Sequence, residues 1–160
     1  MNEKQLFFDT LKKYSSGERA ILRRCCGKLL KDAEGQAVVL FYRCLPRKIS
    51  SGEEDKWFAA ACFSCLWDAE NVGEPIEEIF ARIKEDSGSM EHRLASLLDL
   101  EWEADGYFLI KLCRIIKMAK SKGMTVDCMS LLNDLIYWNS SVHSVQRKWA
   151  RAMYIKNSIV

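Results

Sequence analysis

Apolar residues recur at three- and four-residue spacing through most of the chain, and this spacing restricts the fold more than any other feature. A stripe of this kind within 104–121 consists of Leu109, Leu112, Cys113, Ile116 and Ala119. Such a period is typical of a helix with one buried face. No segment sustains a period-two alternation, and the 160 residues include only 2 prolines and 8 glycines. The sequence therefore predicts an all-α protein, a compact two-lobed bundle of about eight or nine helices.

Local signals predict where several helices begin and end. Ser15 and Glu18 have the spacing of a capping box, which places a helix over 19–26. The apolar segment 36–45 is compatible with a buried strand, but no partner strand is evident, so we expect a short helix stopped by Pro46. Asn139 and the two serines after it are expected to cap the last helix. The remaining helices are expected over 3–14, 54–69, 75–85, 90–99, 104–121 and 126–138.

The short break Ser87-Gly-Ser89 is the best candidate for a boundary between two lobes. We therefore expect an N-terminal helical lobe over 1–88 and a C-terminal helical lobe over 89–160, packed together as one unit. No internal repeat or low-complexity tract divides the chain further.

The seven cysteines do not predict a disulfide framework, because their number is odd and no secretory signal pattern precedes them. No apolar run approaches the roughly 20 residues of a membrane span, so we expect a cytoplasmic protein without membrane contact. Cys62 and Cys65 have C-x₂-C spacing, which is compatible with a metal or redox site. They lie in a strongly apolar helical segment without a second such pair, and a zinc ribbon needs four ligands. We therefore expect them to be buried small hydrophobes.

Signals for catalysis are weak throughout the chain. His92 and His143 are far apart and lie in polar surroundings, which favours surface or capping positions. Carboxylates at 99, 101, 103 and 105 alternate, but they lack the glycine and terminal glutamate of a calcium loop. No nucleotide-binding or hydrolase motif is present. The sequence predicts a binding protein rather than an enzyme, with no cofactor, no metal and no small-molecule substrate.

The net charge of +2 conceals three segments of alternating sign. Residues 1–48 contain 11 basic and 5 acidic residues, residues 49–110 contain 4 and 15, and residues 111–160 contain 9 and 2. The segments therefore carry net charges of +6, −11 and +7. Two basic ends around an acidic middle indicate a surface that faces nucleic acid on one side and protein on the other, or charges that pair across one surface.

Basic residues also recur at helical spacing. They form three sets: Arg19, Arg23 and Arg24; Lys111, Arg114, Lys117 and Lys120; Arg147, Lys148 and Arg151. Arginine binds phosphate with two parallel hydrogen bonds, so such rows can line a phosphate backbone without distinguishing bases. In the last helix we expect Trp149 to anchor the buried side, while the cations project outward. Basic helix faces are also common on ordinary proteins, so the pattern alone is compatible with a solvated surface.

The order of several short patterns resembles the small subunit (CasB family) of the type I-E CRISPR effector complex, Cascade. The patterns are Ala20-Ile-Leu-Arg-Arg24, Phe41-Tyr-Arg-Cys-Leu-Pro46, Arg93-Leu-Ala-Ser-Leu-Leu-Asp99, Leu112-Cys-Arg-Ile-Ile116, Val126-Asp-Cys-Met-Ser-Leu-Leu-Asn-Asp-Leu135, Tyr137-Trp138 and Val145-Gln-Arg-Lys-Trp-Ala-Arg-Ala-Met-Tyr154. The resemblance implies an all-helical, non-catalytic protein of which two copies lie beside the backbone subunits that carry the guide RNA. It further implies contact with guide RNA, with target and displaced DNA, and with the large subunit, so that the R-loop is stabilised in antiviral defence.

Position by position, the resemblance implies that seven cations form the nucleic-acid face. These are Arg23, Arg24, Arg93, Arg114, Arg147, Lys148 and Arg151. Trp138 and Trp149 match aromatic positions that we assign to the core. The acidic segment from Glu101 to Asp105, which precedes the long helix, departs from the family pattern. It leaves open whether Arg93 and Arg114 share one groove.

Two other classes of function remain open at this point. One is an all-α adaptor whose charged faces contact only proteins. The other is a stand-alone DNA-binding regulator with a helix-turn-helix, for which Gly123 marks the nearest candidate turn. The helix after that turn is too apolar to enter a DNA groove.

Overall fold

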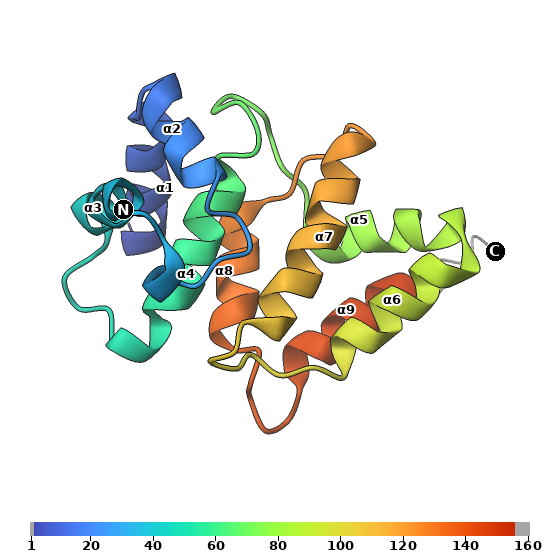
Figure 1. The fold of residues 1–160 in the computed structure, drawn as a ribbon. Helices are drawn as coiled ribbons and strands as arrows, with labels where there is room; N and C mark the ends of the chain where they lie inside the picture. Colours follow the sequence, from blue (N-terminus) through green and yellow to red (C-terminus); the bar gives the residue numbers. More distant parts are fainter. Residues whose placement is uncertain (1, 156–160) are drawn as a thin grey trace.

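The computed structural model describes residues 2–155, which form a bundle of helices joined by short connections (Figure 1). Within this range there are nine α-helices, two short 3₁₀ turns and no strand, apart from an isolated bridge between Glu74 and Val126. The helices are α1 (Glu3–Lys13), α2 (Ser16–Arg23), α3 (Gly35–Cys44), α4 (Ser51–Ser64), α5 (Ile76–Ile83), α6 (Gly88–Leu98), α7 (Tyr107–Ser121), α8 (Cys128–Ile136) and α9 (Ser144–Tyr154). The all-α prediction is confirmed.

Two of the local predictions for the N-terminal half are also confirmed. The Ser15 hydroxyl accepts a hydrogen bond from the backbone N–H of Glu18, and the Glu18 carboxylate accepts one from the N–H of Ser15. This capping box begins α2. The segment 36–45 is helical rather than extended, because Ala37, Leu40 and Phe41 lie on one face of α3 and are all buried.

The predicted start of the last helix is wrong. Asn139 does not cap α9, because its side-chain amide accepts from the N–H of Trp102 and donates to the carbonyl of the same residue, both at 2.9 Å. The helix begins at Ser144, and His143 precedes it with a positive φ of 51° and no side-chain capping bond. Val142 lies outside the helix and is exposed. Two hydrogen bonds to a distant loop thus replace the single bond of a cap.

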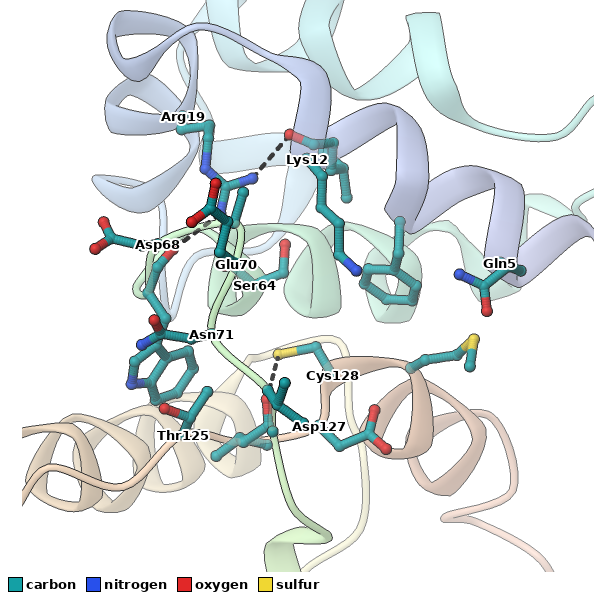
Figure 2. A pocket seen from close by; sticks show the side chains of 18 residues that line it. Gln5, Lys12, Arg19, Ser64, Asp68, Glu70, Asn71, Thr125, Asp127 and Cys128 are labelled. Carbon is teal, nitrogen blue, oxygen red and sulfur yellow. Dashed lines mark hydrogen bonds between the residues drawn. The ribbon is translucent and has the colours of Figure 1, made fainter.

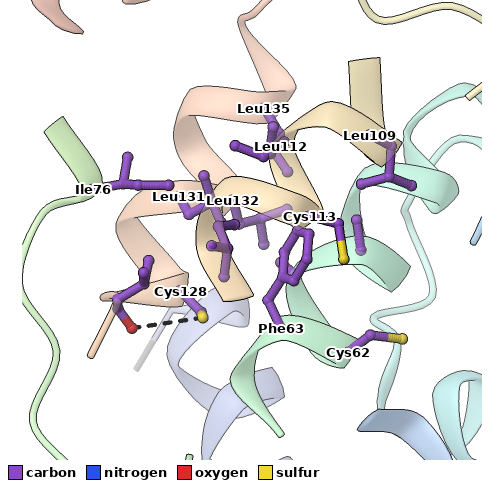
Figure 3. Close-up of a cluster of buried hydrophobic side chains, with 14 of the residues drawn as sticks. Cys62, Phe63, Ile76, Leu109, Leu112, Cys113, Cys128, Leu131, Leu132 and Leu135 are labelled. Carbon is purple, nitrogen blue, oxygen red and sulfur yellow. Dashed lines mark hydrogen bonds between the residues drawn. The ribbon is translucent and has the colours of Figure 1, made fainter. Parts of the chain in front are cut away.

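Helices α4 and α8 pack against each other at the centre of the molecule (Figure 1). Every residue of α4 from Trp57 to Phe63 is buried, so this helix is apolar on all sides, as expected for a central helix. Side chains from α4, α7 and α8 meet in the core (Figure 3). Buried residues from both sides of residue 88 belong to this one core, and the division into lobes at that point stays a prediction.

An aromatic cluster joins α9 to the rest of the fold. The ring centroids of Trp138 and Trp149 lie 4.8 Å apart, Phe108 contacts the first tryptophan and Phe80 of α5 contacts the second. Both tryptophans are fully buried, which confirms their assignment to the core. No helix in the described range combines the length and hydropathy needed to span a membrane.

Candidate nucleic-acid interface

Helices α6 and α7 form a surface groove of about 480 Å³ that brings Arg93 and Arg114 together. The groove is lined by His92, Arg93, Ser96, Leu97, Leu100, Tyr107, Lys111, Arg114, Ile115 and Met118. Packing explains the position of both arginines. Arg93 precedes Leu94 in α6, and Arg114 precedes Ile115 in α7. Because both hydrophobic residues are buried, each arginine projects from the edge of the helix–helix contact. None of the ten lining residues is acidic, and the groove therefore carries a positive charge.

Lys111 and Tyr107 also line this groove, and the tyrosine was not among the residues expected at the site. The two residues lie one helical turn apart, and the Lys111 ammonium is 5.2 Å from the centroid of the Tyr107 ring. Half of the tyrosine surface is exposed, although this residue begins a helix whose next two residues are buried. The spacing of an aromatic and a cation at i and i+4 was the available signal in the sequence.

The C-terminal end of α2, which carries Arg23 and Arg24, lies against the middle of α7. Gly27 follows with a positive φ of 88°, and a Cβ atom there would lie 3.2 Å from the Sγ of Cys113, which is the neighbour of Arg114. Burial raises the pKa of Cys26 well above its ordinary range, and the nearby Lys117 ammonium opposes this shift. Both arginines are exposed, and one Nη of Arg23 donates weakly to the Cys65 carbonyl at 3.5 Å. This end of α2 is thus adjacent to the basic side of α7.

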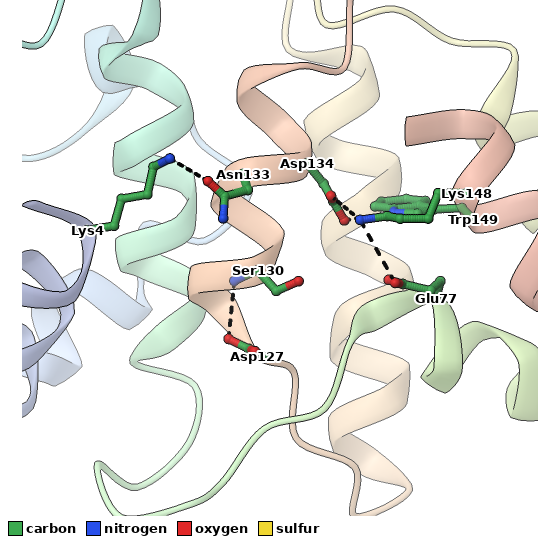
Figure 4. Close-up of polar contacts among 8 residues, drawn as sticks. All are labelled: Lys4, Glu77, Asp127, Ser130, Asn133, Asp134, Lys148 and Trp149. Carbon is green, nitrogen blue, oxygen red and sulfur yellow. Dashed lines mark hydrogen bonds and ion pairs between the residues drawn. The ribbon is translucent and has the colours of Figure 1, made fainter. Parts of the chain in front are cut away.

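The three cations of α9 differ in what they contact. Arg147 and Arg151 are exposed and lie one turn apart. Lys148 donates to the Oδ1 of Asp134 in α8 at 2.5 Å, and its ammonium is 3.9 Å from the Oε1 of Glu77 in α5 (Figure 4). Asp134 also accepts from the indole N–H of Trp149 at 2.9 Å, so the lysine belongs to the contact that fixes α9 to α8.

Burial around this contact perturbs the pKa of Glu77. Desolvation raises its pKa above the ordinary 4.5, while a backbone hydrogen bond and Lys148 oppose the shift. Its Oε2 is buried without a hydrogen-bond partner. The ionised carboxylate is therefore poorly compensated in the folded protein.

Arg19, the first cation of the α2 set, points inward. Its guanidinium donates to the carbonyls of Leu11, Ser64 and Trp67 at 2.8–3.0 Å and thereby ties the ends of α1 and α4 to α2. Only 9% of the residue is exposed. Helical spacing alone grouped it with the surface arginines, because the carbonyls that bind it lie up to 48 residues away.

A second cavity, of about 540 Å³, lies beside Arg19 (Figure 2). Its lining combines Lys12 with the carboxylates of Asp68, Glu70 and Asp127, and the Arg19 guanidinium is occupied by the carbonyls described above. This mixture of charges does not favour an anionic ligand.

The cysteines and histidines follow the sequence prediction. All seven thiols are free, and Cys62 and Cys65 are buried, with burial raising the pKa of both thiols. No group of three or more potential metal ligands occurs within residues 2–155. His92 and His143 are exposed, at the edge of the groove and at the start of α9. The burial of Cys62 and Cys65 confirms the prediction that this pair consists of buried small hydrophobes.

Taken together, the described residues define an all-α protein in which cations from α6 and α7 line one surface groove. The family model for the CRISPR-associated protein Cse2 matches residues 18–154. The chain therefore belongs to the Cse2 family, in agreement with the resemblance found in the sequence.

Solved structures of this family share the fold. A Cse2-family protein from Thermus thermophilus is 25% identical, with a TM-score of 0.76 over 96% of this chain and 99% of that one. CasB from M. ruber is 21% identical, with a TM-score of 0.74 over 96% and 93% of the two chains. A chain from a CRISPR RNA-guided surveillance complex is 18% identical, with a TM-score of 0.76 over 94% and 91%. No curated protein matches the chain in sequence.

Proposed function

We propose that this chain is a non-catalytic, nucleic-acid-binding subunit of an RNA-guided CRISPR surveillance complex of the Cascade type. In this role it holds the phosphate backbone of the R-loop, including the displaced strand. Its partners are guide RNA, target and displaced DNA, the backbone and large subunits, and a second copy of itself. Membership of the Cse2 family supports the assembly, and one structurally similar chain comes from such a complex.

The observation that carries the proposal is the groove between α6 and α7. Arg93, Arg114 and Lys111 meet there from two helices, and no carboxylate is among its described lining residues. Unwinding DNA against a guide is a nearly balanced exchange of one duplex for another. A few phosphate contacts can therefore decide whether the open state persists. A displaced strand needs no base-specific contact to be held in this way.

The acidic connection between α6 and α7 limits the path of a strand. Asp99, Glu101, Glu103 and Asp105 are all exposed on it. A polyanion is repelled at that end, so we propose that it leaves the groove along α7 toward Lys117 and the end of α2. The acidic connection is then available to a protein neighbour.

A salt series with the purified full chain tests the charge contacts. Single-stranded DNA binding should weaken as salt rises from about 50 to 200 mM, with a slope of about −0.7 per neutralised phosphate. Replacing Arg93 and Arg114 together by alanine should make the slope shallower by roughly 1.4, since two phosphate contacts are lost. The matched control replaces Arg82 and Lys122, which are equally cationic but already paired with Glu74 and Asp86.

The same variants are then assembled into the complex, and R-loop formation is measured separately from assembly. We expect R-loop formation to fall for the groove variant while assembly and the control variant stay unchanged. Equal behaviour of groove and control variants, or binding that does not depend on salt, would contradict the proposal and favour a protein adaptor.

The terminal helix is tested in parallel. Replacing Arg147 and Arg151 by alanine should weaken R-loop formation, since both side chains are exposed and have no acidic partner within the described hydrogen bonds and ion pairs. Unchanged R-loop formation in this variant would remove α9 from the interface and leave the groove between α6 and α7 as its centre.

A further inference from the structure

Tyr107 lies in an unusual environment for an exposed aromatic residue. It is half exposed and lines the basic groove, whereas its neighbours Phe108 and Leu109 are buried in the core. The N–H of Tyr107 donates to the Asp105 carboxylate at 3.0 Å, and Gly106, the N-cap residue of α7, has a positive φ of 75°. The backbone that carries the ring is therefore held in place before any ligand arrives.

The groove has an apolar floor and cationic edges. Leu97, Leu100, Ile115 and Met118 contribute its apolar lining, while Arg93 and Arg114 come from the two opposing helices. Its volume of about 480 Å³ falls within the range of roughly 300–1,000 Å³ that is typical of small-molecule pockets. A phosphate backbone alone needs neither an apolar floor nor an aromatic side chain.

We infer that this groove binds one unpaired nucleotide, with its base stacked on the Tyr107 ring and its flanking phosphates held by Arg93 and Arg114. The inference rests on the proposed function and makes it more specific, because it restricts the ligand at this site to a single strand. In a duplex both faces of each base are covered by neighbouring bases, whereas an unpaired base has a free face for an aromatic side chain.

Lys111 completes this arrangement. Its ammonium lies over one face of the Tyr107 ring, 5.2 Å from the ring centroid, so the base stacks on the opposite face. Because every base has a stacking face, the site holds a strand without preference for its sequence.

The experiment compares two single strands of equal length and charge, an oligothymidylate and the same backbone carrying abasic sites. Each is titrated with the full chain at one fixed salt concentration, and affinity is followed by fluorescence anisotropy. We expect the oligothymidylate to bind at least about fivefold more tightly, which corresponds to ~1 kcal/mol, the lower end of the range for stacking on an aromatic side chain.

Three variants locate the preference. Tyr107→Ala should bind both strands with equal affinity, and Tyr107→Phe should keep the preference, because phenylalanine retains a stacking face. Tyr137→Ala is the matched control, since Tyr137 is also exposed but does not line this groove. It should behave as the wild type.

The outcomes separate the two proposals. Equal, salt-dependent binding of both strands by the wild type overturns the stacking site but leaves the proposed backbone-binding function intact. A base preference that survives in Tyr107→Ala overturns the assignment to this residue. If neither strand binds, both the stacking site and the proposed function are refuted, and an acidic protein segment becomes the better candidate for the groove.

Discussion

Replacing Asp134 by alanine removes the acceptor that joins α8 to α9. The carboxylate is buried, and it accepts from the Trp149 indole at 2.9 Å and from Lys148 at 2.5 Å. Without it the buried indole N–H has no acceptor, which costs about 1–3 kcal/mol. Loss of the ion pair adds up to about 1 kcal/mol, since 46% of the lysine side chain is exposed and regains water. We expect the free energy of unfolding to fall by roughly 2–3 kcal/mol, which is a drop of about 5–10 °C in Tm for a chain of this size.

Urea denaturation followed by tryptophan fluorescence measures this change, and related variants divide it into parts. Asp134→Asn keeps an acceptor for the indole and should lose less stability than Asp134→Ala. In a Trp149→Phe background there is no indole N–H to satisfy, so Asp134→Ala should cost about 1–2 kcal/mol less than in the wild type. Lys148→Ala should cost about 1–2 kcal/mol, below the roughly 3–5 kcal/mol of a fully buried pair, because solvent already reaches the lysine. Equal stability of the Asp134→Ala and Asp134→Asn variants would contradict this role of Asp134. The same holds if Asp134→Ala costs as much stability in the Trp149→Phe background as in the wild type.

Three further perturbations test other contacts. Burial raises the pKa of Glu77, so the wild type loses stability as pH rises from about 4.5 through the raised value. Glu77→Gln should show a smaller loss over the same range when urea midpoints are compared. A steeper loss in the variant would contradict this sign. Gly73→Ala should destabilise by about 1–3 kcal/mol, because a Cβ there lies 2.5 Å from the backbone of Val126 and Asp127. A Tm equal to that of the wild type would show that the two segments separate freely. Arg19→Met should lower the free energy of unfolding by about 2–4 kcal/mol, since three carbonyls lose a charged donor. Loss of nucleic-acid affinity at unchanged stability would instead place Arg19 on the surface.

Much of the fold follows from local chemistry that is visible in the sequence. The capping box at Ser15 begins α2 because both of its hydrogen bonds join residues three positions apart. Helix was expected for α3 because no partner strand is evident, and Ala37, Leu40 and Phe41 are indeed buried on one face of this helix. Trp149 is buried as expected for the residue that anchors the last helix, and Trp138 is buried as expected from the family resemblance.

The start of α9 could not be predicted because it depends on a distant partner. Asparagine is a favourable capping residue, but both the oxygen and the amino group of the Asn139 side chain are hydrogen-bonded to the backbone of Trp102, 37 residues away. Only the packing of the loop after α6 against the end of α8 makes that partner available.

The candidate site shows the same division. Sequence spacing identified the cations of α2, α7 and α9, and a family pattern identified Arg93. Only the tertiary structure decides what each of them faces. It places Arg93 and Arg114 on one groove, directs Arg19 to internal carbonyls and pairs Lys148 with Asp134.

Helix formation and most capping depend on residues within about four positions of one another, so the helices, the apolar core and the available charges can be predicted from the sequence. The tertiary structure decided which charges stay free for a polyanion and which aromatic ring lies among them. A cation's partner is set by distance in space. Lys148 is paired with Asp134, whereas Arg147, its neighbour in sequence, is exposed and has no acidic partner among the described ion pairs.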